Sequence, residues 1–259
     1  MRAPANKRPT PKEIARILAI WALLVFASTM FIYMWFYIYC LLLREPNKTR
    51  WHRKMSQLWM GTFMILSGIR FSVRGKHHFD GLENAIVVCN HNSMLDIPVS
   101  FPFLPRANKT IAKKSLSKVP IFGWIYSIGT VLVDRNDSKS RQASFDQKKY
   151  VLNHVLDMLI YPEGTRNKTS APLKSFYDGA FKVALETQTP IMPILFLDVY
   201  DRLNYSSVFS PNPGKCRIVY LEEVLVDGLT MDDVKILKEK VYKKMEEGLI
   251  KYKVSWIKR

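Results

Sequence analysis

The sequence has few cysteines. Only three occur in 259 residues, at positions 40, 89 and 216. A sparse, odd set argues against a disulfide framework and favours a reducing compartment or a membrane. No histidine or cysteine cluster has the spacing of zinc ligands, so neither a metal nor another cofactor is predicted.

Acidic residues are also in the minority. The chain has 22 Asp and Glu against 39 Lys and Arg, which gives a net charge of +17. Such a surface attracts nucleic acid, anionic lipid headgroups or phosphorylated substrates. The sequence contains no nucleic-acid-binding motif, so nucleic acid is not expected as a partner.

Charge is absent altogether from residues 17–43. As one helix this run would extend about 40 Å, longer than a bilayer hydrocarbon core of roughly 30 Å. It is too long for a signal peptide, and no small-residue cleavage site follows it. The run therefore predicts a membrane helix.

The flanks of this run leave its orientation open. Five basic residues precede it and five follow it within residues 44–54, so no positive-inside asymmetry exists. We favour one tilted span. The alternative is that both ends stay on the cytoplasmic face and the segment dips into the bilayer. A shorter apolar patch at 58–69 predicts an interfacial helix over about 55–69, although an ordinary buried helix fits it too.

Strands and helices alternate along the remaining chain. The patterns predict strands at 69–75, 85–89, 129–135, 157–164, 190–199 and 216–224. They predict helices at 93–103, 114–127, 138–156, 178–188 and 230–249, with a loop between the first two. Several strands are wholly apolar. The prediction is an α/β fold with a mixed, largely buried sheet flanked by helices, in which 1–68 anchor the chain and 69–259 form the catalytic domain.

One histidine–aspartate pair lies where the strand 85–89 ends. His91 and Asp96 can meet if the histidine lies in the strand-to-helix turn and the aspartate in the first helical turn. The carboxylate would then accept one imidazole N–H and leave the other nitrogen as a base. This is a hydrolase triad without its serine, so the activated hydroxyl can belong to a substrate. Alone, the spacing equally fits a capping or core role.

A second polar motif, YPEGTR at 161–166, follows another buried strand. Glu163 and Arg166 would be presented at the strand end, where α/β sheets bind ligands. Arg166 is suited to phosphate, and Gly164 shapes the turn. The other interpretation is an internal Glu–Arg pair.

These motifs together resemble a known family. His91-x4-Asp96, KKSLSKVPIFG (113–123), VDR (133–135), YPEGTR and TPIMPI (189–194) are similar in order and spacing to the motif blocks of glycerolipid acyltransferases. The nearest resemblance is to the 1-acylglycerol-3-phosphate (lysophosphatidic acid) acyltransferases. It covers roughly residues 70–200, about half the chain.

The resemblance implies acyl transfer to the sn-2 hydroxyl of lysophosphatidic acid, forming phosphatidic acid for phospholipid biosynthesis. His91 is then the general base, and Asp96 orients it. The donor is acyl-CoA or acyl-carrier protein, and no acyl-enzyme forms. Substrate binding is expected from the following residues: Glu163, Gly164, Thr165, Arg166, Lys113, Lys114 and Arg135.

One position departs from the family pattern. Tyr177 stands where the family commonly has a lysine, and Asp178 adds a negative charge. Lys174 is close enough to substitute for that lysine. The rival predictions are transfer to another lysolipid and a non-enzymatic basic membrane-binding protein. The short chain and few cysteines favour a bacterial inner membrane, with the catalytic domain on the cytoplasmic face.

Overall fold

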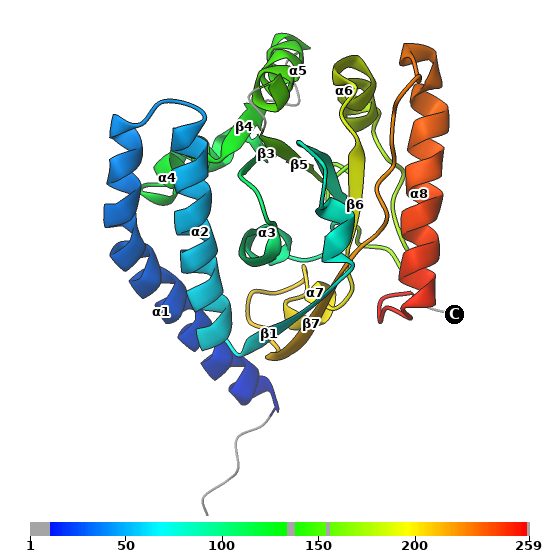
Figure 1. Ribbon diagram of the computed structural model, residues 1–259. Helices are drawn as coiled ribbons and strands as arrows, with labels where there is room; N and C mark the ends of the chain where they lie inside the picture. Colours follow the sequence, from blue (N-terminus) through cyan, green and yellow to red (C-terminus); the bar gives the residue numbers. More distant parts are fainter. Residues whose placement is uncertain (1–10, 134–137, 154–155, 258–259) are drawn as a thin grey trace, which may run out of the picture.

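The protein folds around a single seven-stranded sheet (Figure 1). The computed structural model describes residues 11–133, 138–153 and 156–257. The strands are β1 (Ile69–Arg74), β2 (Ile86–Cys89), β3 (Asn108–Lys113), β4 (Thr130–Val133), β5 (Asp157–Ile160), β6 (Ile191–Phe196) and β7 (Gly214–Tyr220). Their order is β1-β7-β6-β2-β5-β3-β4, and only β6 and β7 pair antiparallel. The predicted mixed sheet is confirmed.

Helices cover both faces of this sheet. They are α1 (Pro11–Ile38), α2 (Asn47–Leu66), α3 (Asp96–Phe103), α4 (Phe122–Ile128), α5 (Ser138–Asn153), α6 (Gly179–Thr187), α7 (Val199–Arg202) and α8 (Val234–Lys251). Because strand side chains alternate, Ile86 and Val88 of β2 pack toward α5, α6 and α8, while Val87 and Cys89 pack toward α2 and α3. The sheet is buried on both faces, which explains the wholly apolar strands.

Three elements differ most from the sequence prediction, while smaller shifts place the start of α3 at Asp96 and the end of β5 at Ile160. Strand β3 occupies residues expected to form a loop, because Asn108–Lys113 has few strand-forming residues and gains its structure by pairing with β4 and β5. The helix expected over 114–127 divides into a 3-10 turn and α4, and Ile121 between them has φ +61°. Helix α2 begins at Asn47, well before the expected position 55, and ends at Leu66.

Helices α1 and α2 form an antiparallel hairpin at one side of the molecule (Figure 1). Polar side chains join the two helices along their length through the pairs Trp21–Leu66, Thr29–Trp59, Tyr33–Thr62 and Tyr37–Ser56. The other side of α1 is exposed and apolar, and includes Leu24, Ile32 and Trp35. Within the described residues, 12–42 form one helical stretch long and apolar enough to cross a membrane.

Helix α2 also contacts the rest of the protein. His52 Nε2 lies 3.0 Å from the carbonyl oxygen of Ile125. The buried Arg53 guanidinium donates to the carbonyl oxygens of Leu104 and Arg106. Since these contacts all involve buried groups of α2, the helix pair and the sheet share one packed interior.

Candidate active site

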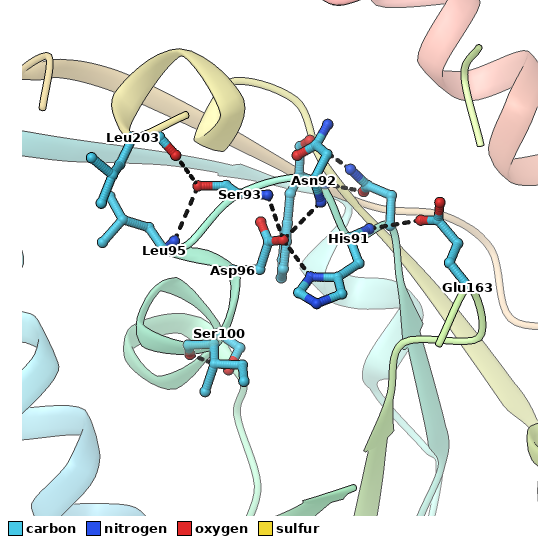
Figure 2. A network of polar contacts seen from close by, with 11 residues as sticks. His91, Asn92, Ser93, Leu95, Asp96, Ser100, Glu163 and Leu203 are labelled. Carbon is cyan, nitrogen blue, oxygen red and sulfur yellow. Dashed lines mark hydrogen bonds and ion pairs between the residues drawn. The ribbon is translucent and has the colours of Figure 1, made fainter. Parts of the chain in front are cut away.

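His91 and Asp96 meet at the carboxyl end of β2. Their Nδ1 and Oδ2 atoms are 2.6 Å apart, and Asp96 is fully buried (Figure 2). The same carboxylate oxygen accepts the backbone N–H groups of Asn92 and Ser93, each at 2.8 Å. A carboxylate can only accept here, so Nδ1 carries the proton and Nε2 has the free lone pair. The structure therefore contains the predicted contact between the two side chains.

The tight loop between β2 and α3 makes this geometry possible. Asp96 is the first residue of α3, and its carboxylate turns back onto the loop N–H groups. The Ser93 hydroxyl donates to the carbonyl oxygen of Leu203 at 2.6 Å and accepts the Leu95 N–H. The ring of Tyr161 packs against the His91 ring with their centroids 4.5 Å apart. Packing and hydrogen bonds therefore fix the imidazole orientation.

A basic pocket opens beside His91. It has a volume of about 560 Å³, and it is lined by His91, Thr165, Arg166, Lys168, Thr169 and Lys174. Three of its six lining residues are cationic, which suits a phosphate group. Lys174 Nζ lies 2.6 Å from Thr165 Oγ1 and donates to it, which places at the pocket the lysine that is close enough in sequence to substitute for the family lysine.

Glu163 is turned away from this pocket. Only 1% of its surface is exposed, and its two oxygens accept the backbone N–H groups of His91 at 2.8 Å and Lys174 at 2.9 Å. Burial raises its pKa to about 7. The expectation that Glu163 is presented with Arg166 at the strand end is wrong, and no ion pair joins these two described residues. Glu163 joins the backbone at His91 to the pocket loop instead.

Gly164 shapes the turn that follows. Its φ is +69°, a conformation that L side chains rarely adopt. A Cβ atom at this position would lie 2.6 Å from the Tyr177 ring. Tyr177 itself is 71% exposed, and Asp178 is ion-paired with Lys238 at 2.6 Å. The extra negative charge at Asp178 is thus paired with a lysine of α8.

The remaining predicted residues divide into two groups. Thr165 and Arg166 line the basic pocket, as expected from their motif. The side chains of Lys113 and Lys114 and the whole of Arg135 lie outside the described residues. Lys168 and Thr169 also line the pocket and were missed; their only signal in the sequence is their closeness to Arg166.

The loop from 163 to 174 is bonded to His91 twice. Besides the Glu163 contact, the Asn167 N–H donates to the His91 carbonyl oxygen at 2.6 Å. Asn167 further orders its own loop by donating to the Ala171 carbonyl and accepting the Thr169 N–H. The base and the cations of the pocket therefore belong to one hydrogen-bonded unit.

Comparison with known proteins places the chain in a family. Residues 70–197 match the family model described as Acyltransferase. The chain is 35% identical over 182 residues to 1-acyl-sn-glycerol-3-phosphate acyltransferase alpha of Mus musculus, covering 68% of this chain. The chain belongs to this acyltransferase family.

Other relatives carry related names. A 1-acyl-sn-glycerol-3-phosphate acyltransferase of Haemophilus influenzae is 28% identical, with 74% of this chain and 79% of that protein aligned. The alignment spans only 62% of the mouse protein, less than two thirds of its length. The fold resembles the crystal structure of the 1-acyl-sn-glycerophosphate (LPA) acyltransferase PlsC of Thermotoga maritima, with a TM-score of 0.78, 22% identity, and 95% and 100% of the two chains covered.

Proposed function

We propose that this protein transfers an acyl chain from a thioester to the sn-2 hydroxyl of lysophosphatidic acid, forming phosphatidic acid. The observation that carries this proposal is the position of an oriented imidazole at the edge of a pocket with three cations. A base and a phosphate site in one pocket fit an acceptor that carries a hydroxyl and a phosphate. The names of the relatives support the same reaction.

The chemistry follows from the imidazole orientation. Nδ1–H stays bonded to Asp96, and Nε2 removes the proton of the acceptor hydroxyl as its oxygen attacks the thioester carbonyl. The tetrahedral intermediate then collapses with cleavage of the carbon–sulfur bond. The imidazolium returns its proton to the leaving thiolate. Asp96 stabilises the transient positive charge on the ring, and the enzyme carries no acyl group at any stage.

Acceptor binding is assigned to the basic pocket. Arg166, Lys168 and Lys174 surround a space that a phosphate monoester would enter with its negative charge. Transfer to another lysolipid is the alternative, because exposed Tyr177 stands where the family commonly has a lysine. The donor, acyl-CoA or acyl-carrier protein, is assigned to Lys113, Lys114 and Arg135 only from the family resemblance.

The membrane position that we propose is a helix pair lying in one leaflet. Helix α1 is joined to α2 along its length, and buried groups of α2 bond to the sheet domain at Ile125 and Leu104. If α1 spanned the bilayer, α2 and these domain contacts would be drawn into the hydrocarbon. The packing therefore favours the alternative in which the segment dips. A cytoplasmic face agrees with three free cysteines, and the bacterial inner membrane stays a prediction.

The test is acyl transfer by the purified protein from labelled acyl-CoA or acyl-carrier protein. Lysophosphatidic acid and lysophosphatidylcholine are supplied in parallel. We expect label in phosphatidic acid, and a rate about 10²–10⁴-fold lower for His91→Ala, the usual contribution of a general base. Lys240→Ala, an exposed lysine of α8, is the control for loss of one charge. Transfer that persists in His91→Ala contradicts the mechanism, and label only in phosphatidylcholine contradicts the acceptor.

A further inference from the structure

The segment between α7 and β7 is an uncharged surface loop. Residues 203–213 contain no charged residue, although charged residues make up 24% of the chain. The loop is closed at its base, where Leu203 pairs with Pro211 and the Asn212 N–H donates to the Arg202 carbonyl at 2.8 Å. At its tip, Val208 and Phe209 are about half exposed. Paired apolar side chains at the tip of a loop are a sign of an apolar partner.

The tip adjoins the exposed side of α1. An apolar cavity of about 210 Å³ lies between them, with α1 contributing Leu18, Trp21 and Leu23 to its wall and the loop contributing Val208 and Pro211. Trp21, Leu23 and Val208 are each about half exposed. They therefore form the rim of the cavity, and this rim joins the loop tip to the apolar side of α1 as one continuous surface.

The other end of the loop adjoins the basic pocket. The Tyr205 hydroxyl donates to the carbonyl oxygen of Lys168 at 3.2 Å, and the Lys168 ammonium lies 5.7 Å from the centre of the Tyr205 ring. Lys168 lines the basic pocket. Between Tyr205 and Val208 the loop thus passes from a cationic site to an apolar one. A lipid leaflet has the same order, from headgroups to hydrocarbon, and tyrosine favours the boundary between them.

We propose that the 203–213 loop is a second membrane contact, whose Val208–Phe209 tip enters the same leaflet as α1. This inference rests on the proposed position of α1 in one leaflet. Embedding the α1–α2 pair at one side of the sheet leaves the tilt of the sheet domain over the membrane unset. A second contact beside the basic pocket removes that freedom and turns the pocket toward the headgroups.

The base of the loop is bonded to the loop that holds the catalytic pair. Ser93 donates its hydroxyl proton to the Leu203 carbonyl oxygen (Figure 2). It also forms a backbone bridge with Asn204. Ser93 is also one of the residues whose N–H binds the Asp96 carboxylate. Hydrogen bonds through Ser93 and Asp96 therefore connect the base of the 203–213 loop to the His91 ring.

The experiment measures contact with lipid directly. The full-length Phe209→Trp variant is mixed with phosphatidylcholine–phosphatidylglycerol vesicles whose acyl chains carry bromine, which quenches indole fluorescence on contact. The control is Ile236→Trp, at a position 66% exposed on α8, at the opposite side of the sheet from α1 (Figure 1). We expect the emission added by Phe209→Trp to be lost and that added by Ile236→Trp to be retained.

A second variant tests the contribution to binding. Phe209→Asp should weaken vesicle binding about tenfold, the order expected for losing one buried aromatic side chain, while Ile236→Asp should leave it unchanged. Unquenched emission from Phe209→Trp together with normal vesicle binding by Phe209→Asp would overturn the inference. Light scattering that shows dimers dissolved by Phe209→Asp would assign the tip to a second copy instead. Neither readout needs acyl transfer, so an inactive wild type would contradict the proposed function alone.

Discussion

Glu163 is the residue whose environment differs most from its expected role. Its buried carboxylate accepts one N–H from the base loop and one from the pocket loop. Burial disfavours the charged form of this carboxyl group and raises its pKa to about 7. A carboxyl group that accepts two N–H groups from different loops organises a site without itself lining the pocket.

The raised pKa of Glu163 predicts a pH-dependent stability. The folded pKa of about 7 lies above the ordinary value of 4.5, so the folded state binds the proton more tightly. This contribution is fully present below about pH 4.5 and is lost as the pH rises to about 7, a change of about 3 kcal/mol in the free energy of unfolding. Denaturant unfolding across this pH range measures it. Glu163→Gln should remove this component, and identical pH profiles for the two proteins would contradict it.

The cations of the pocket carry a second prediction at this scale. Arg166→Ala and Lys174→Ala should each raise the KM for lysophosphatidic acid, because each removes a charge that lines the pocket. The effect on kcat should be smaller, since neither side chain is bonded to the Asp96 carboxylate. Steady-state kinetics with Lys240→Ala as the reference separates pocket charge from overall charge. A KM unchanged from wild type in both pocket variants would move the phosphate site elsewhere.

Part of the site could be predicted from local sequence. His91 and Asp96 are five residues apart, so one turn decides whether they meet. Glu163 and Lys168 could not be placed, because their positions depend on contacts between two loops about seventy residues apart in the chain. The direction in which a loop side chain points is a tertiary property.

The strands also divide into those that local sequence predicts and those that depend on tertiary contacts. Strand β2 has a continuous apolar run because it is buried on both faces, and the sequence alone predicts it. Strand β3 carries Asn108, Lys109 and Lys113, which are not typical strand residues. It forms because it pairs with β4 and β5. Helix α2 began earlier than predicted because its first turns, which include the buried His52 and Arg53, look like a solvated basic segment.

An ion pair between the buried Asp157 and the partly exposed Arg106 ties the strand ends together and gives the prediction at this scale. Asp157, at the start of β5, accepts the Ala85 N–H at 2.8 Å and two bonds from the Arg106 guanidinium. Asp157→Ala leaves the buried Ala85 N–H without its acceptor and the Arg106 guanidinium, 29% exposed, without its carboxylate, so unfolding should become easier by about 1–3 kcal/mol. Glu186→Ala, which breaks the exposed Lys149–Glu186 pair, should change little. Equal effects of the two variants in urea unfolding would contradict this assignment.

At the scale of the whole molecule, the helix pair is part of the fold. Tyr37 is fully buried and hydrogen-bonds with Ser56, and Thr29 accepts the indole N–H of Trp59. Tyr37 and Trp59 also belong to the same buried cluster as Val87 and Cys89 of β2, so the hairpin packs on the sheet domain across the predicted boundary at residue 68.

Removal of residues 1–42 should for this reason fail to release a soluble enzyme. The truncation exposes the side of α2 that α1 covers, so we expect aggregation in detergent-free buffer on size-exclusion chromatography. The matched variant, Leu24→Gln with Ile32→Gln, changes only the exposed side of α1 and should stay folded while losing affinity for vesicles. A monomeric, active truncated protein would contradict the shared interior.

Under the proposed function, the double bonding of the 163–174 loop to His91 links the choice of lipid headgroup to the rate of transfer. The loop that supplies the pocket cations also grips the backbone of the base from both sides, through Glu163 and Asn167. Replacing this loop with that of a relative would therefore change both the residues that line the headgroup pocket and the orientation of the His91 imidazole. The choice of headgroup and the rate of transfer would then change together. A variant with a new headgroup preference would need compensating changes in residues 90–96 to regain the original rate.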